Sequence, residues 1–219
     1  MILNGSGNSL NVALLGGTFD PFHVGHLAVA EIVSQRFKPA EVVFVPAAMP
    51  WLKSDRIISP SADRLEMVRL GILGNPHYRL STLEIERPGP SFTVDTLREV
   101  RARILPHDDL YFIIGWDNLL DFGRWREPSR IIELAKIVAV PRIGYRVPDD
   151  AVLEKILPGL SQRVILLDKP EIDISASIIR ERVSRNLPID HMVPALVAGY
   201  IRQRGLYRTT PVSGCQQGQ

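Results

Sequence analysis

The sequence predicts an α/β fold: a doubly wound, mostly parallel sheet with helices on both faces. Two apolar runs, Glu41–Val45 and Leu110–Ile114, lack the polar–apolar alternation of a half-exposed strand, and such runs are typical of parallel strands covered on both faces. Strand-like and helix-like segments also alternate along the chain, which favours a doubly wound sheet. Ligands of such sheets bind at the carboxyl ends of the strands. We therefore expect functional residues directly after strands.

The expected strands are short runs rich in aliphatic and aromatic residues, at residues 11–15, 41–46, 78–86, 109–114, 136–140 and 163–167. The expected helices alternate with them, at residues 25–36, 61–73, 93–104, 127–134, 149–157, 177–185 and 193–204. Val12–Leu15 indicates the first strand and Leu27–Val33 the first helix. Pro88–Pro90 ends the third strand, because proline cannot donate to a sheet ladder. Ser91 or Thr93 caps the helix that follows.

Composition narrows the function classes. The chain has 219 residues, a net charge of +2 and no basic stripe interleaved with aromatic residues, which argues against nucleic acid as a partner. No apolar stretch is long enough to span a membrane, and the N-terminus lacks signal-peptide features. Cys215 is the lone cysteine and cannot form an internal disulfide, so a cytoplasmic location is expected. The oligomeric state stays open.

The most informative segment is GGTFDPFHVGH, from Gly16 to His26. It lies between a strand and a helix, a layout that points backbone N–H groups at a phosphate. His23 and His26 share one face of the first helical turn, where the helix dipole favours neutral imidazoles. Two such donors suit the charge that builds up on a leaving pyrophosphate. No protein metal site is predicted, because zinc needs further ligands and no HExxH or cysteine-rich pattern is present.

This run resembles the signature of the HxGH-type nucleotidyltransferase superfamily, whose members join ATP or CTP to a phosphorylated partner. With His rather than Thr at position 23, it resembles the nicotinate mononucleotide adenylyltransferases in particular. The resemblance covers residues 11–208 and implies a Rossmann-like nucleotidyltransferase fold. We expect a single nucleotidyltransferase domain over that range, with flexible tails at residues 1–10 and 209–219. ATP-binding residues implied in this first motif are Gly16, Gly17, Thr18, Phe19, His23 and His26.

A second motif is ISASIIR, which ends at Arg180. Ser175 or Ser177 is a natural N-cap, and Arg180 falls near the start of the helix, where the dipole disfavours a cation. A bound anion would resolve that conflict. The motif resembles the second signature of the superfamily, which grips ATP phosphates, so we expect Ser177 and Arg180 to bind ATP. Arg182 is expected on a solvated face.

Gly115 and Asp117 follow a strand, where a glycine permits close backbone approach and a carboxylate suits a ribose hydroxyl. An aspartate in a turn is also common, but the resemblance favours an ATP contact for both residues. Trp125 suits either core packing or, as the resemblance implies, stacking on a pyridine ring. The resemblance also implies that the backbone N–H groups of Thr93 and Arg126 meet the carboxylate of nicotinate. Thr96 is expected only to help cap its helix.

The loop Pro46–Arg56 is long for a compact α/β domain, and such loops are usually functional. Its Lys53 matches the lysine of the family's usual Pro-Pro-His-Lys and is predicted to reach a phosphate. Trp51 and Leu52 replace the second proline and the histidine of that pattern. Met67 is expected in the core.

The sequence therefore predicts an adenylyltransferase of NAD biosynthesis. It joins ATP and nicotinate mononucleotide to give nicotinic acid adenine dinucleotide and pyrophosphate, with Mg²⁺ carried by ATP. The predicted catalytic residues, which align the reactants and stabilise charge, are His23, His26, Lys53 and Arg180. Two alternatives stay open: the same chemistry on nicotinamide mononucleotide or phosphopantetheine, and a non-catalytic nucleotide-binding protein.

Overall fold

A six-stranded sheet forms the centre of the molecule, in a computed structural model that describes residues 11–48, 58–169 and 173–208. The strands are β1 (Val12–Gly17), β2 (Glu41–Pro46), β3 (Tyr78–Leu80), β4 (Leu110–Gly115), β5 (Lys136–Val140) and β6 (Val164–Leu166). Every pairing is parallel, in the order β3-β2-β1-β4-β5-β6. The order reverses between β1 and β4, which is where ligands bind in such sheets. The predicted doubly wound fold class is confirmed.

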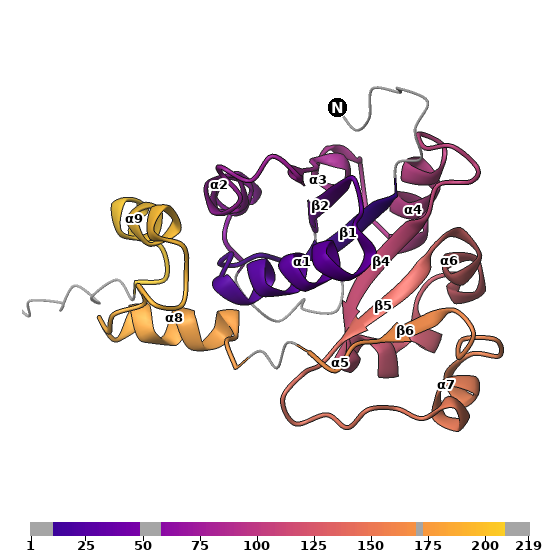
Figure 1. The fold of residues 1–219 in the computed structure, drawn as a ribbon. Helices are drawn as coiled ribbons and strands as arrows, with labels where there is room; N and C mark the ends of the chain where they lie inside the picture. The colour runs from indigo at the N-terminus through magenta and orange to yellow at the C-terminus, as the bar shows by residue number, and fades with distance from the viewer. Residues whose placement is uncertain (1–10, 49–57, 170–172, 209–219) are drawn as a thin grey trace, which may run out of the picture.

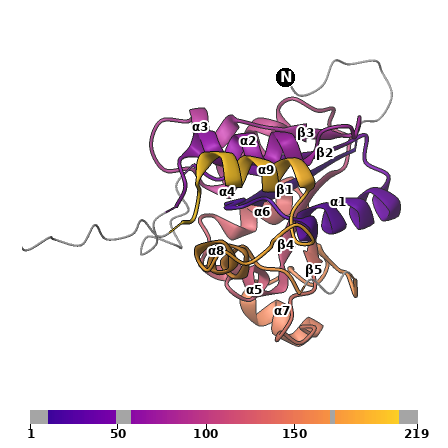
Figure 2. The same cartoon turned by 90° about the vertical axis from the view of Figure 1, so that its left-hand side faces the viewer.

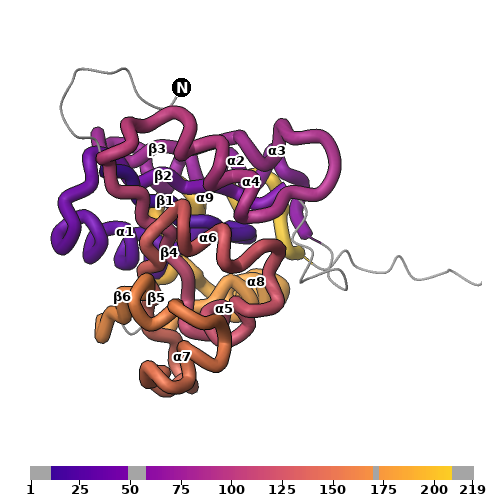
Figure 3. Tube along the Cα trace, turned by 90° about the vertical axis from the view of Figure 1, so that its right-hand side faces the viewer, coloured from indigo at the N-terminus to yellow at the C-terminus, as the bar shows by residue number. Residues whose placement is uncertain are grey.

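Helices cover both faces of the sheet. They are α1 (Val24–Phe37), α2 (Ser61–Gly71), α3 (Leu83–Glu86), α4 (Thr93–Arg101), α5 (Trp116–Leu120), α6 (Pro128–Leu134), α7 (Asp150–Ile156), α8 (Ala176–Ser184) and α9 (Ala195–Arg204). Figure 1 shows α1 and α2 on one side of the strands and α4 and α6 on the other. The two turned views face these layers in turn, with α1 and α9 in front in Figure 2 and α4 and α6 in front in Figure 3.

Each face of the sheet has its own hydrophobic core, because successive residues of a strand point to opposite faces. Leu15 of β1 belongs to a cluster with Val29 of α1. Its neighbour Leu14 belongs to the other cluster, with Val94 of α4. Met67 is fully buried in the first cluster, as the sequence predicts. The two layers therefore fix α1 and α4 on opposite sides of the same strand.

The prediction of a strand over residues 78–86 is wrong beyond Leu80. The N–H of Ser81 still donates to the carbonyl of Phe44, but the Ser81 hydroxyl then accepts a bond from the N–H of Leu83 at 3.4 Å. The next residues, Leu83–Glu86, form α3. β3 is at the edge of the sheet, so a longer strand here would pair with one neighbour only. Leucine and glutamate are good helix formers, and the segment after β3 therefore forms a helix.

The helix α5 was not among the predicted elements. It has only five residues, too few to show the apolar periodicity that marks a helix in a sequence. Its presence places Asp117 and Asn118 on a helical turn directly after β4.

A buried carboxylate fastens the C-terminal helix to α2. Asp63 is 3% exposed and its Oδ1 accepts bonds from the Tyr200 hydroxyl at 2.7 Å and from Arg204 Nε at 3.0 Å. These contacts hold α9 against α2, as Figure 2 shows. None of the described helices is both long and apolar enough to cross a membrane.

Candidate active site

A cavity of about 390 Å³ lies at the carboxyl ends of β1 and β4, where the strand order reverses. Its wall includes Gly25, Thr93 and Ala176, which belong to the first turns of α1, α4 and α8. Three helix N-termini therefore border one cavity. Because helix N-termini carry unsatisfied N–H groups and a partial positive charge, the cavity favours negatively charged ligands.

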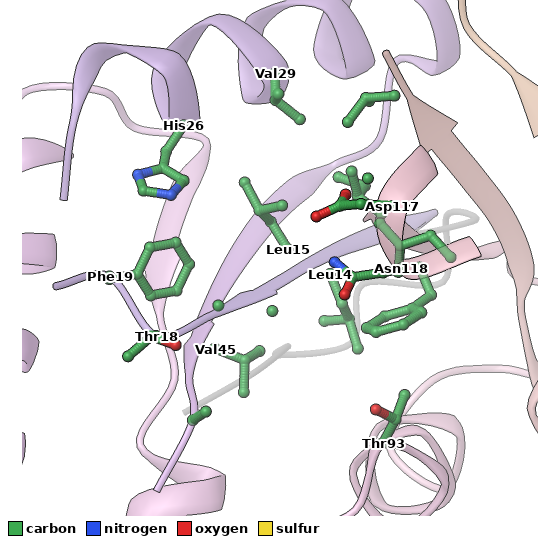
Figure 4. Close-up of a pocket in the computed structure, with 18 of the residues that line it drawn as sticks. Leu14, Leu15, Thr18, Phe19, His26, Val29, Val45, Thr93, Asp117 and Asn118 are labelled. Carbon is green, nitrogen blue, oxygen red and sulfur yellow. The ribbon is translucent and has the colours of Figure 1, made fainter. Parts of the chain in front are cut away.

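The structure brings together, in the wall of this cavity, every described residue that the sequence predicts for the site. They are Gly16, Gly17, Thr18, Phe19, His23, His26, Thr93, Gly115, Asp117, Trp125, Arg126, Ser177 and Arg180. Figure 4 shows His26 and Phe19 on one side of the cavity and Asp117 and Asn118 on the other, with Thr93 on a separate helix. Lys53 lies outside the described residues.

The two histidines stand at the start of α1 with their rings stacked. His23 is the N-cap residue, and its ring centroid lies 3.7 Å from that of His26, with an angle of 22° between the planes. Nδ1 of His26 accepts a hydrogen bond from the backbone N–H of His23 at 3.1 Å. Because Nδ1 is the acceptor, the neutral ring of His26 carries its proton on Nε2. The ring also stacks on Phe22, at 5.2 Å between centroids.

His23 is neutral at neutral pH. Burial and, to a smaller extent, the positive charge of Arg142 lower its pKa to about 4. The residue is 5% exposed, and its Nδ1 makes no hydrogen bond with the rest of the described chain. The sequence argument expected neutrality from the helix dipole, whereas burial is the larger cause. A buried polar atom of this kind is satisfied when a ligand supplies the partner.

The start of α8 presents Ser177 and Arg180. The cap is Ser175, whose Oγ accepts a hydrogen bond from the N–H of Ile178 at 3.3 Å, which decides between the two serines. One guanidinium nitrogen of Arg180 donates to Ser177 Oγ at 3.2 Å, and the other donates to the carbonyl of Asp20. Arg180 thus joins α8 to the turn that leads into α1.

Arg182 is outside the cavity wall. It is partly exposed and donates from Nε to the carbonyl of Pro188 at 2.9 Å. It therefore fastens the C-terminal end of α8.

Gly115 ends β4 and is the N-cap residue of α5. A Cβ placed there would lie 2.3 Å from Oδ1 of Asp117, so a side chain at this position would displace the carboxylate. Asn118 lies beside Asp117 in the cavity wall (Figure 4) and was not predicted. The only signal for it in the sequence is its position next to Asp117.

Trp125 packs against two aromatic rings and also faces the cavity. Its ring packs at 5.3 Å from the Phe122 ring and at 6.1 Å, edge-on, from the Phe112 ring. It also lines the cavity. The aromatic packing fixes the indole in place while part of it faces the cavity.

The N-terminus of α4 and the segment around Arg126 lie side by side. The Arg126 guanidinium stands 4.5 Å from the centre of the Phe92 ring, and Phe92 is the N-cap residue of α4. Within the described part of the chain, no side chain caps this helix. Its first N–H groups, beginning at Thr93, are therefore available to an anion.

Arg64 matches the family's RLEM-like helix in the sequence, but no role was predicted for it. It is 1% exposed and donates to the carbonyls of Thr18 at 3.0 Å, Ala47 at 2.7 Å and Ser59 at 3.1 Å. It thus ties the segments after β1 and β2 to the start of α2. An arginine on the buried side of a helix was the only signal, and burial is not visible in a single sequence.

No group of three or more His, Cys, Asp or Glu side chains in residues 11–48, 58–169 and 173–208 is placed to hold a metal ion. Asp20 lines the cavity, but its carboxylate is occupied. Oδ1 accepts from the Tyr207 hydroxyl and Oδ2 from the N–H of Ser59 at 3.2 Å.

Curated relatives are similar in sequence over most of this chain. A relative from Dehalococcoides mccartyi, named probable nicotinate-nucleotide adenylyltransferase, is 49% identical over 91% of this chain and 98% of its own length. A relative of the same name from a Roseiflexus species is 42% identical over 92% of this chain and 100% of its own length.

Solved structures share the fold. The nicotinic acid mononucleotide adenylyltransferase of Plasmodium falciparum, complexed with NaAD, superposes with a TM-score of 0.73 at 22% identity, over 90% of this chain and 97% of its own. A putative nicotinate-nucleotide adenylyltransferase from Vibrio parahaemolyticus superposes with a TM-score of 0.65 at 20% identity, over 92% and 97%.

The model of the cytidylyltransferase-like family matches residues 14–182, a range that contains both histidines of α1 and the Ser177–Arg180 pair of α8. Together with the identity to the curated relatives over nearly the whole chain, this match shows that the chain belongs to the cytidylyltransferase-like family and, within it, to the nicotinate-nucleotide adenylyltransferases.

Proposed function

We propose that this chain transfers the adenylyl group of ATP to nicotinate mononucleotide, which yields nicotinic acid adenine dinucleotide and pyrophosphate. The observation that carries the proposal is the single cavity that His26, Arg180, Thr93 and Trp125 share. It combines donors for a polyphosphate with an aromatic ring and an uncapped helix N-terminus. The curated relatives bear the name of this activity.

The chemistry requires no protein nucleophile. An oxygen of the mononucleotide phosphate attacks the α-phosphorus of ATP, and the bond from that phosphorus to the bridging oxygen of pyrophosphate breaks in line. The attacking phosphate is already an anion, so the protein aligns the reactants and stabilises charge. His26, with its proton on Nε2, donates a hydrogen bond toward the leaving pyrophosphate. His23 contacts the same phosphates and, because it is neutral, needs no acidic partner in the protein.

Arg180 and Ser177 hold the β- and γ-phosphates from the start of α8. Their mutual hydrogen bond orients the guanidinium, whose planar fork suits phosphate oxygens. Asp117, directly after β4, accepts a hydrogen bond from a ribose hydroxyl of ATP, close to the backbone of Gly115. Lys53, outside the described residues, adds a point charge over the phosphates.

Mg²⁺ fits this site as an ion carried by the nucleotide. Of the groups proposed to meet the phosphates, the histidines, Arg180 and Lys53 donate hydrogen bonds and do not ligate Mg²⁺, Ser177 Oγ already accepts from Arg180, and both oxygens of Asp20 are engaged within the protein. Phosphate oxygens and water would therefore hold the ion. Its chemistry would be to neutralise part of the polyphosphate charge.

The pyridine nucleotide occupies the side of the cavity formed by Trp125 and α4. The indole stacks on the pyridine ring, and the N–H groups of Thr93 and Arg126 donate to the nicotinate carboxylate. An uncapped helix N-terminus favours this anion over the neutral amide of nicotinamide.

The experiment is pyrophosphate release with ATP and Mg²⁺, in parallel reactions with nicotinate mononucleotide, nicotinamide mononucleotide and phosphopantetheine. A strong preference for the nicotinate substrate supports the reaction and the carboxylate site together. Equal use of both pyridine nucleotides removes the carboxylate argument. Nucleotide binding without pyrophosphate release from any of the three would support a binding protein instead.

A further inference from the structure

A polar network lies beneath the proposed pyridine-nucleotide side of the cavity. Thr96 Oγ1 donates to Glu84 Oε1 at 2.8 Å and accepts from Arg87 Nη1 at 3.2 Å. Arg87 also donates to Ser91 Oγ at 3.2 Å and to Glu99 Oε2 at 3.1 Å. The hydroxyl of Thr96 is therefore the link between the carboxylate of α3 and the guanidinium that follows it.

Glu84 is the residue of this network that the loss of a hydrogen bond would affect most. Burial raises the pKa of its carboxyl, against the opposite effects of the Thr96 hydrogen bond and the Arg87 charge. Thr96 itself is 4% exposed. A partly buried carboxylate that loses a hydrogen-bond donor must find another partner or turn toward water.

The cavity borders this network directly. Glu84, Ser91 and Thr96 all line it, together with Thr93, which lies less than one helical turn before Thr96 in α4. A carboxylate that left Thr96 and turned into the cavity would place its negative charge on the side where Thr93 is proposed to meet the nicotinate carboxylate. Like charges in a partly desolvated site repel strongly.

We propose that Thr96 is a positioning residue for substrate choice: it holds the Glu84 carboxylate away from the acid group of the pyridine nucleotide. This inference rests on the proposed function, because it presumes that nicotinate binds at Thr93. Among the described residues, no side chain caps α4, so the capping role expected for Thr96 is wrong, and the inference assigns it a positioning role instead. It assigns Glu84 and Arg87 a shared role in the selection of the acid over the amide.

The test is kinetic, with Thr96→Val, Thr96→Ser and the double variant Thr96→Val/Glu84→Gln. Thr96→Val keeps the shape but removes the hydroxyl. We expect its KM for nicotinate mononucleotide to rise about tenfold, with kcat and the KM for ATP within about twofold of the parent. Thr96→Ser restores the hydroxyl and the parental KM.

The double variant separates charge from structure. If the misplaced charge of Glu84 is the cause, its neutral glutamine restores the KM to within about threefold of the parent. A KM that stays high in the double variant overturns the proposal, as does a Thr96→Val enzyme with parental KM. If Thr96→Val does not fold, Arg87→Met removes the other partner of the network. Its KM for nicotinate mononucleotide is then compared with that of Arg87→Met/Glu84→Gln.

The matched control is Tyr200→Phe, which also removes one buried hydrogen bond, to Asp63, but outside the cavity wall. It should lower the unfolding temperature without changing the KM for nicotinate mononucleotide. The parent enzyme tests the proposed function separately: no turnover with nicotinate mononucleotide refutes that function, whereas normal parental turnover with an unchanged Thr96→Val enzyme refutes only the role of Thr96.

Discussion

The hydroxyl of Tyr207 donates a hydrogen bond to Oδ1 of Asp20, a residue 187 positions earlier in the chain. Asp20 precedes His23, and its own carbonyl accepts a bond from Arg180. The turn before His23, the start of α8 and the segment after α9 therefore meet at one buried residue, Asp20, which is 4% exposed.

Tyr207→Phe should weaken both folding and catalysis. The change leaves Asp20 buried with one donor fewer, which costs about 1–3 kcal/mol of unfolding free energy. The turn before His23 then loses one of its restraints, so kcat should fall while the substrate KM values change less. Urea denaturation and steady-state kinetics measure the two effects. An enzyme with parental stability and parental kcat would show that the contact restrains nothing.

His26→Ala should lower kcat by about 100-fold, the scale for the loss of one donor to developing charge. The circular dichroism spectrum and the unfolding temperature should show that the fold survives. His107→Ala is the control, because that ring is 65% exposed and lies outside the cavity wall, and its activity should equal the parent's. Parental turnover in His26→Ala would remove His26 from the catalytic group.

The burial of His23 should make stability depend on pH. Its folded pKa of about 4 lies below the ordinary histidine value of 6.5, so the unfolded chain binds a proton more readily than the folded one. The contribution of neutral His23 to the free energy of unfolding is therefore fully present above pH 6.5 and is lost as the pH falls from about 6.5 to about 4. The loss between pH 7 and pH 5 should be about 2 kcal/mol.

The measurement is urea denaturation at both pH values, for the parent and for His23→Gln. Glutamine does not titrate, so the variant should lose about 2 kcal/mol less stability between the two pH values than the parent loses. Identical losses in the two proteins would mean that His23 does not titrate as its burial implies.

Gly115→Ala should impair nucleotide binding with little effect on folding. The added methyl group would lie 2.3 Å from Asp117 Oδ1 and push the carboxylate out of place, and we expect the KM for ATP to rise about tenfold. Gly199→Ala is the matched control, because nothing lies within 4 Å of a Cβ at that position in α9. It should raise stability by about 0.5–1 kcal/mol and leave kinetics unchanged. Equal KM values in the two variants would contradict the proposed role of Asp117.

The sequence predicts the fold best where structure depends on neighbours along the chain. The apolar runs Val12–Leu15 and Leu110–Ile114 form adjacent parallel strands, and the turn between β1 and α1 brings His23 and His26 together because its motif is local. The segment 83–86 was mispredicted because edge position, which the sequence does not reveal, decides between strand and helix there. The five residues of α5 are too few for a periodic signal.

The supporting contacts of the site could not be predicted, because they join residues distant in sequence. Arg64 reaches the carbonyl of Thr18, 46 positions away, and Tyr207 reaches Asp20. No local pattern marks such pairs, since burial and contact arise only when the sheet has assembled. The neutrality of His23 was expected, but its larger cause, burial, also depends on that assembly.

The position of α8 in the chain has a consequence for synthesis. All six strands are complete at Leu166, before the ribosome adds Ser177 and Arg180. The sheet and the histidines of α1 can therefore assemble on a nascent chain that still lacks its second phosphate clamp. Because Ala176, Ser177 and Arg180 form part of the cavity wall, a chain released before α8 would carry the proposed site with one side missing.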